Sequence, residues 1–377
     1  MSIKTAIVGC GRIFKRHCEA LRYNDNFEII AVCDILPERL RIASETLGIP
    51  GYYNIDELIK KIEKIDLIVI CTQPSEHAKI AIRAIKNNIN VLIEKPITLS
   101  IDDCYLIYNS LKENKFKSKI YEVKQNRYNA PIEELKKIMF GGFLGKIVLI
   151  SARLRWCRFD DYFNQDPINW RGTWKHDGGV FASQACHHID MLRYIGGKIL
   201  DVTAKAKKTL LNIETEDTGI AICEYADGFL GTIEATNAAR PDNLEASISV
   251  LGENGTVIIG GTHLNKIDYW KVKDITSPML SDDNTNIYGI GHKRVYEEVY
   301  KDMSGEKSNV VDLSDAMENV RLVNAIYESI YTGTDEIARS LQAQPILSYL
   351  LLYSPAIMAL IGFVGGAIMF SGGQPNE

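Results

Sequence analysis

The chain has 377 residues, of which 46% are hydrophobic and 24% charged, a composition typical of folded globular proteins and not of disordered or collagen-like chains. This length exceeds what one hydrophobic core usually supports, so we expect at least two domains. The net charge of -5 indicates no general polyanion-binding surface, and nucleic acid is not expected as a partner.

The first 120 residues alternate apolar runs with helical patterns. Helices are predicted up to about Tyr23, over Pro37–Leu47 and over Ser75–Lys86. Buried strands are predicted at Thr5–Val8, Glu28–Cys33, Asp66–Cys71 and Asn90–Ile93. Uniformly apolar strands that alternate with helices are typical of a doubly wound parallel sheet. We therefore predict an α/β domain of this kind over residues 1–121.

The pattern changes after about Ile120. Pro131–Met139 and Ser314–Tyr331 have helical periodicity. Longer alternating segments predict strands at Lys146–Arg158, Leu200–Lys207, Thr218–Tyr225, Gly228–Thr236, Glu245–Leu251 and Gly255–Ile259. Residues 122–335 are therefore predicted to form an α+β domain with an open, mostly antiparallel sheet, for substrate binding and oligomerisation.

The last segment, 336–377, is atypical of such a domain. Ile346–Phe370 contains no charged residue and is long enough to span a bilayer. Alternatively it is a buried helix or a tail foreign to the fold. The eight cysteines are scattered without disulfide or zinc-finger spacing, and MSIKTAIVGC has no signal-peptide pattern. We expect a cytoplasmic protein, tethered to a membrane only if residues 346–370 insert.

A dinucleotide-binding turn is predicted where the first strand meets the first helix. Gly9 permits a tight turn, and Gly11 lets a pyrophosphate approach the backbone and the helix N-terminus. Phe14 replaces the third glycine of the usual GxGxxG pattern. Asp34 ends the second strand, where a carboxylate binds ribose hydroxyls and repels a 2′-phosphate. The cofactor is therefore predicted to be NAD, and the first domain a Rossmann domain; Arg39 is the nearby cation that would weaken the preference over NADP.

The combination of the GxGRI turn, Glu94-Lys95-Pro96 and His187-xx-Asp190 resembles the Gfo/Idh/MocA family of NAD(P)-dependent oxidoreductases, over roughly residues 3–335. The segments KQNRYN (124–129) and WRGTW (170–174) resemble one branch, the UDP-N-acetylglucosaminuronic acid 3-dehydrogenases of bacterial surface-polysaccharide pathways. The resemblance implies oxidation of the sugar C3 hydroxyl to a ketone, a partner aminotransferase that converts the ketone to an amine, and a homo-oligomer formed through the open sheet face. With the turn, it implies cofactor contacts from Gly9, Gly11, Arg12, Ile13, Asp34, Thr72, Glu94 and Lys95.

Oxidation of a secondary alcohol needs a base and a group that stabilises the alkoxide. Lys95 is predicted to supply the stabilising charge, because it ends a parallel strand, where open α/β sheets bind ligands. Glu94 is expected to orient its amine. The resemblance selects His187 as the base, with Asp190 one helical turn away to orient it and the neighbouring His188 structural. No metal is expected, because hydride transfer assisted by these two residues needs none.

The predicted substrate contacts are Lys95, Arg127, Tyr128, Arg171, Ser183 and His187. Arginines suit the diphosphate or carboxylate of a nucleotide sugar. Arg153, Arg155 and Arg158 belong to the same group of cations, although a solvated or subunit-interface face is favoured for the strand arginines. Ser183 stands where the family has Asp and the sugar-nucleotide branch favours Asn. Trp170, Trp174 and Tyr128 suit stacking on a sugar or on uracil, or core packing.

Two other functions are compatible with these residues. One is an NAD-dependent dehydrogenase of a free polyol or sugar, of the inositol or glucose type, which would gain little from a UDP group. The other is a non-catalytic NAD-binding protein, suggested by Ser183 and by the atypical tail.

Overall fold

The computed structural model describes residues 2–22, 24–280 and 291–332. The predicted tail, 336–377, and its apolar segment, 346–370, lie outside the described residues. Within the described part of the chain, no helix combines the length and the apolar character that a membrane crossing requires. The free cysteines form no disulfide among themselves.

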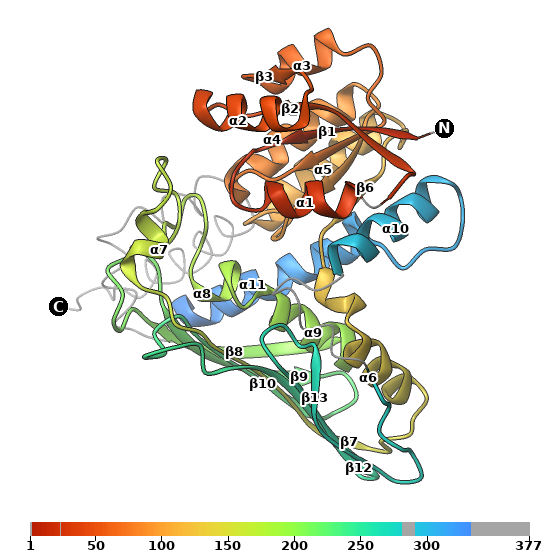
Figure 1. Ribbon diagram of the computed structural model, residues 1–377. Helices are drawn as coiled ribbons and strands as arrows, with labels where there is room; N and C mark the ends of the chain where they lie inside the picture. Colours follow the sequence, from red (N-terminus) through yellow and green to blue (C-terminus); the bar gives the residue numbers. More distant parts are fainter. Residues whose placement is uncertain (1, 23, 281–290, 333–377) are drawn as a thin grey trace, which may run out of the picture. The chain divides into compact units, whose positions relative to one another are not determined.

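The first sheet has the strand order β14-β6-β5-β4-β1-β2-β3 (Figure 1). All neighbouring strands pair in parallel except β14, which pairs antiparallel with β6. The order reverses direction between β1 and β4, and open α/β sheets bind their ligands at such a point. The strands are β1 (Ile3–Val8), β2 (Phe27–Cys33), β3 (Gly51–Tyr52), β4 (Leu67–Ile70), β5 (Asn90–Ile93), β6 (Ile120–Glu122) and β14 (Val311–Asp312).

Helices cover both faces of this sheet. One face packs Ala20 and Leu21 of the first helix and Val295 and Val299 of a helix far along the chain. The other face packs residues of four helices, including Val320 near the end of the described chain. The helices are α1 (Phe14–Arg22), α2 (Pro37–Leu47), α3 (Ile55–Lys61), α4 (Pro74–Lys86), α5 (Ile101–Glu113), α10 (Gly291–Met303) and α11 (Leu313–Thr332). Both faces are therefore buried, which explains the uniformly apolar strands.

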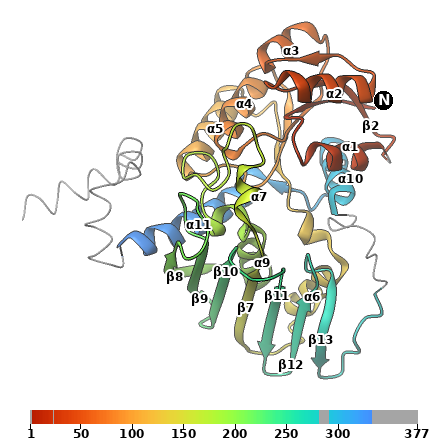
Figure 2. The ribbon, with the colours of Figure 1, turned by 60° about the vertical axis from the view of Figure 1, so that its left-hand side comes forward.

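The second sheet has the order β13-β12-β11-β7-β10-β9-β8, which Figure 2 shows with the strands side by side. Its neighbours pair antiparallel except β7 and β10, which are parallel. The strands are β7 (Ile147–Arg155), β8 (Ile199–Lys207), β9 (Thr218–Tyr225), β10 (Leu230–Thr236), β11 (Glu245–Gly252), β12 (Gly255–Gly260) and β13 (Lys266–Val272). The predicted fold class, a Rossmann sheet plus a mostly antiparallel sheet, is confirmed.

One face of the second sheet is covered by helices (Figure 1), and the other carries exposed residues in alternation, as in β9. The elements between the two sheets are the 3-10 helix η1 (Gln125–Tyr128), α6 (Ala130–Phe140), α7 (Asp160–Asn164), α8 (Val180–Ser183) and α9 (Cys186–Gly196). The domain limits at 121 and 335 stay a prediction. The packing of α10, β14 and α11 shows that residues after the second sheet return to the first one.

Candidate active site at the end of the first sheet

The turn after β1 has the geometry of a nucleotide-binding loop. Gly9 has φ +99°, and a Cβ there would lie 2.7 Å from the carbonyl carbon of Cys71 and 2.9 Å from the amide nitrogen of Thr72. Only glycine fits between the ends of β1 and β4. A Cβ on Gly11, by contrast, would meet only an Arg39 nitrogen at 3.7 Å, so its surroundings leave room for a pyrophosphate. The residues present therefore fit NAD.

Asp34 fixes the shape of this turn. Its carboxylate accepts hydrogen bonds from the backbone N–H of Cys10 at 2.7 Å and of Leu36 at 2.8 Å. Arg39 forms an ion pair with Asp166 at 3.0 Å. Its charge is therefore already matched, which favours NAD over NADP at this site. Arg12 is exposed, and Ile13 and Thr72 are half-buried beside the turn.

Glu94 does not orient the Lys95 amine, and that prediction is wrong. One carboxylate oxygen of Glu94 contacts His17 Nε2 at 2.9 Å, and the other accepts the backbone N–H of Lys95 at 3.1 Å. His292 Nε2 lies 3.5 Å from the first oxygen, so the three side chains form a buried cluster of metal-ligand type. Burial opposes the charge of Glu94, but the two histidines hold its pKa well below its usual range. Glu94 therefore ties the Lys95 backbone to α1 and α10.

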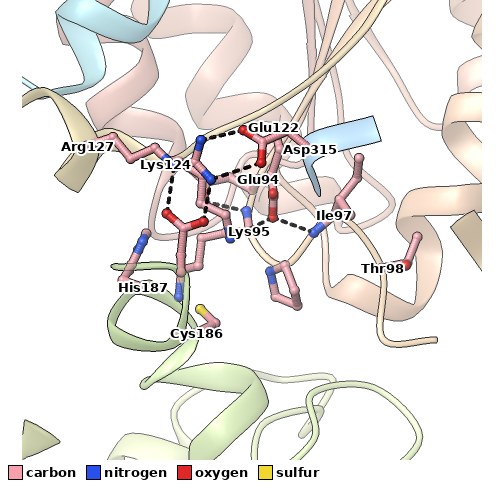
Figure 3. Close-up of polar contacts among 12 residues, drawn as sticks. Glu94, Lys95, Ile97, Thr98, Glu122, Lys124, Arg127, Cys186, His187 and Asp315 are labelled. Atoms are coloured by element: carbon pink, nitrogen blue, oxygen red, sulfur yellow. Dashed lines mark hydrogen bonds and ion pairs between the residues drawn. The ribbon is translucent and has the colours of Figure 1, made fainter. Parts of the chain in front are cut away.

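Lys95 reaches into the second half of the fold (Figure 3). Its Nζ donates to the backbone oxygen of Ser183 at 2.9 Å. Burial works against the ammonium charge, but Glu94 and Asp177 are among the neighbouring groups that raise its pKa above the usual value. Lys95 therefore stays charged. The Ser183 hydroxyl donates to the Gly179 oxygen at 2.8 Å, which makes it part of the α8 backbone network.

His187 is a buried neutral imidazole. Burial, together with the charges of Lys95 and Lys124, lowers its pKa well below the usual value. Its Nε2 lies 3.2 Å from Nε2 of Gln125, and its buried Nδ1 has no hydrogen-bond partner among the described residues. Because the Gln125 amide nitrogen can only donate, Nε2 is the unprotonated nitrogen of this neutral ring and the one that can accept a proton.

Asp190 does not orient His187, which corrects the expectation from their three-residue spacing. Both oxygens of Asp190 accept from Arg127, at 2.5 and 2.8 Å. A second carboxylate, Asp315, lies 2.5 Å from the Arg127 Nη1. Arg127 is thus enclosed by two carboxylates, and Tyr128 is buried with its hydroxyl donating to the Asn309 oxygen at 3.1 Å. Their substrate roles stay predictions, because both side chains have other partners here.

The remaining predicted cations fall into two groups. Arg153 and Arg155 share the exposed sheet face and pair with Glu245, and Arg155 also pairs with Glu234. Whether this face is solvated or forms a subunit interface stays a prediction. Arg171 instead lies over the ring of Trp170, with 4.7 Å between the guanidinium carbon and the ring centroid. Trp174 packs edge-on against Tyr327.

Three residues near the site were missed from the sequence. Gln125 and Lys124 belong to the KQNRYN segment, which was noted without assigning a role to either residue. Lys124 is almost fully buried and pairs with Glu122 at 3.0 Å (Figure 3). Tyr162, in α7, lies among several arginines. No periodicity marks any of the three. Gln125 and Tyr162 contact residues of distant segments, and Lys124 pairs locally, with Glu122.

Two family profiles match this chain. One is described as the oxidoreductase family with an NAD-binding Rossmann fold and matches residues 3–121; the other is the GFO/IDH/MocA C-terminal domain and matches residues 132–258. Among characterised relatives, myo-inositol 2-dehydrogenase of Thermotoga maritima is 25% identical, covering 68% of this chain and 74% of the relative.

Two solved structures are more similar. The WlbA dehydrogenase of Bordetella pertussis, in complex with NADH and UDP-GlcNAcA, has a TM-score of 0.81 and 32% identity, covering 89% of this chain and 98% of that one. The WlbA dehydrogenase of Chromobacterium violaceum, with the same two ligands, has a TM-score of 0.80 and 33% identity, covering 88% and 94%. This chain therefore belongs to the Gfo/Idh/MocA family and is an NAD-dependent oxidoreductase that acts on sugar or polyol hydroxyls.

Proposed function

We propose that this protein oxidises the C3 hydroxyl of a UDP-linked N-acetylamino sugar, the uronic acid, to a 3-keto sugar. The observation that carries the proposal is a charged Lys95, directly after β5, near enough to a neutral His187 of α9 to lower the pKa of that imidazole, in a chain about one third identical to two dehydrogenases bound to NADH and UDP-GlcNAcA. The predicted motifs KQNRYN and WRGTW support the same branch.

The residues divide the chemistry between them. His187 takes the proton of the hydroxyl, for which a buried neutral imidazole is suited. Lys95 donates a hydrogen bond to the same oxygen and stabilises its negative charge while the carbonyl forms. When bound, NAD supplies the acceptor for the hydride that leaves C3. Gly9, Gly11 and Asp34 hold the cofactor, and the Ser183 backbone oxygen keeps the Lys95 ammonium in place.

A ketone at C3 is the substrate that an aminotransferase needs to install an amino group. We therefore propose that an enzyme of that class consumes the product, within the biosynthesis of a surface-polysaccharide sugar. A homo-oligomer, a cytoplasmic location and any membrane contact of residues 346–370 remain predictions from the sequence.

A second candidate is the oxidation of a free polyol or sugar. It is favoured by the inositol dehydrogenases among the relatives, and by glucose-6-phosphate 3-dehydrogenase of Bacillus subtilis, which is 24% identical over 76% of this chain. These identities are lower than those of the two dehydrogenases that hold UDP-GlcNAcA. The two candidates differ in whether the UDP group contributes to binding.

The test is NADH formation with UDP-N-acetylglucosaminuronic acid, UDP-N-acetylglucosamine and myo-inositol, each with NAD and with NADP. A parallel reaction contains 2-oxoglutarate and is assayed for ketone, because recycling of the cofactor would hide NADH. Reduction of the product with borodeuteride followed by NMR locates the ketone. We expect turnover of the UDP-uronate with NAD and deuterium at C3.

Lys95→Met and His187→Asn are expected to lower kcat by at least about 100-fold, the usual contribution of general acid–base groups. Lys79→Met is the matched control, since this lysine is exposed on α4 and forms a surface ion pair with Glu76. Turnover of inositol without turnover of the UDP-uronate would transfer the assignment to the polyol reaction. Binding of NAD with no oxidation of any sugar would support the non-catalytic alternative.

A further inference from the structure

Three arginines from separate segments surround the ring of Tyr162. Arg12 belongs to the dinucleotide turn, Arg158 follows β7, and Arg171 belongs to the WRGTW loop. Their guanidinium carbons lie 5.6, 5.1 and 5.3 Å from the centroid of the Tyr162 ring. We call these three residues the Tyr162 arginine cluster.

The cluster lacks the carboxylates that accompany other arginines of this protein. Arg127 and Arg155 each pair with two carboxylates. Within residues 2–22, 24–280 and 291–332, no carboxylate forms an ion pair with a member of the cluster. Arg158 donates to the Cys157 oxygen and to Asn243, but its buried Nε has no partner there. Converging positive charges with spare N–H groups indicate a site for an anion.

The cluster adjoins the proposed reaction site. The Tyr162 hydroxyl accepts a hydrogen bond from Gln184 Nε2 at 3.0 Å. Gln184 follows Ser183, whose backbone oxygen holds the Lys95 ammonium at 2.9 Å. Burial and the nearby Arg12 charge lower the pKa of Arg158, which agrees with cations held close together in a partly dry environment. An anion bound here would lie near Lys95.

We propose that the Tyr162 arginine cluster is a subsite for a diphosphate ester. This rests on the proposed function in taking the diphosphate to be that of the UDP-sugar. Guanidinium groups match phosphate oxygens two at a time, and the rings of Tyr162 and Trp170 keep the Arg171 fork in a defined plane. Two phosphates would neutralise the mutual repulsion of the arginines.

The pyrophosphate of NAD has the same chemistry, so the test measures both sources. Calorimetric titrations of the full chain use UDP, uridine and, separately, NAD. Arg158→Gln and Arg171→Gln are expected to weaken UDP binding about 10- to 100-fold each, as loss of a charge-assisted hydrogen bond predicts, and to leave uridine and NAD affinities unchanged. Arg153→Gln removes the same charge from the exposed face of the second sheet and is expected to bind UDP as the wild type does.

Weakened NAD binding with unchanged UDP binding in the two cluster variants would overturn the proposal in favour of the cofactor. An equal loss in Arg153→Gln would also overturn it, as a non-specific charge effect. Arg158→Lys and Arg171→Lys keep the positive charge but lose the planar guanidinium that binds two phosphate oxygens at once. Variants that still fold and bind UDP more weakly support the subsite. UDP binding that depends on the cluster, without oxidation of any UDP-sugar, would sustain the subsite and reject the proposed function.

Discussion

Two arginines of this protein each bridge two carboxylates, but in opposite surroundings. Arg127 joins η1 to α9 and α11 through Asp190 and Asp315, and 5% of its side chain is exposed. Arg155 joins β7 to β10 and β11 through Glu234 and Glu245, and 32% of its side chain is exposed. Water can replace both partners of Arg155, but it cannot reach Asp190, the fully buried partner of Arg127. We therefore expect burial, more than the number of ion pairs, to decide how much such a bridge contributes to the free energy of unfolding.

The largest expected effect is that of Arg127→Met. It removes both hydrogen bonds that Arg127 donates to the fully buried Asp190 and leaves the longer ion pair with Arg193, at 3.9 Å; removal of one member of a buried pair costs about 3–5 kcal/mol. Urea unfolding of the full chain measures this loss, with Arg155→Met as the matched control. Equal shifts of the two midpoints would break the comparison between the two bridges.

Glu216 offers a contrast with Asp190: it is also a buried carboxyl, but no cation is paired with it among the described residues. The hydroxyl of Tyr327 and the N–H of Phe181 donate to it, and burial raises its pKa to about 7. The folded protein keeps this proton while the unfolded chain ionises above about 4.3, so stability is lost as pH rises through that window. The difference in free energy of unfolding between Glu216→Gln and the wild type should therefore shift by roughly 1–3 kcal/mol in favour of the variant between pH 5 and pH 8. A stability difference that does not change with pH would contradict this.

Asp315 tests how the stability of the buried bridge depends on pH in the acidic range. Burial opposes its charge, but Arg127 and Arg193 lower its pKa to about 2. Its contribution is therefore complete above its ordinary pKa, about 3.9, and disappears as pH falls towards 2. Asp315→Asn should cost roughly 1–2 kcal/mol at pH 6 and progressively less below pH 4, in urea titrations at each pH. An undiminished cost at pH 3 would assign the loss to packing instead.

The smallest effect is expected for Arg155→Met alone. Exposed ion pairs contribute at most about 1 kcal/mol and are screened by salt. The unfolding midpoint of this variant should therefore lie slightly below that of the wild type at low ionic strength and approach it at high ionic strength. A loss as large as that of Arg127→Met would mean that the sheet face is covered in solution.

The first sheet was predictable from the sequence because its strands are buried on both faces. The apolar run at Glu28–Cys33 became β2 (Phe27–Cys33), and the predicted helix over Pro37–Leu47 is α2. Helix α10 was not predicted, although Val295 and Val299 pack on the same sheet, because no local signal links them to a sheet formed by the first 122 residues.

The candidate site was predictable as a set of residues but not as a set of contacts. The motif Glu94-Lys95-Pro96 located the end of β5, yet the carboxylate of Glu94 turns to His17 and His292. A three-residue spacing shows that His187 and Asp190 can share a helix face, but it does not reveal Arg127 across from Asp190. Partners from distant segments are set by tertiary packing, which single-sequence patterns do not record.

Strand β14 has a consequence for how this chain can be divided. It closes the edge of the first sheet beside β6, and α11 covers Ile107 and Leu111 on that face. A fragment cut after β6 would keep every residue of the nucleotide-binding turn and still expose an open strand edge next to apolar side chains, a template for aggregation. The first sheet therefore depends on residues 291–332 as well as on the first 122 residues, and that N-terminal stretch is not expected to fold as a unit by itself.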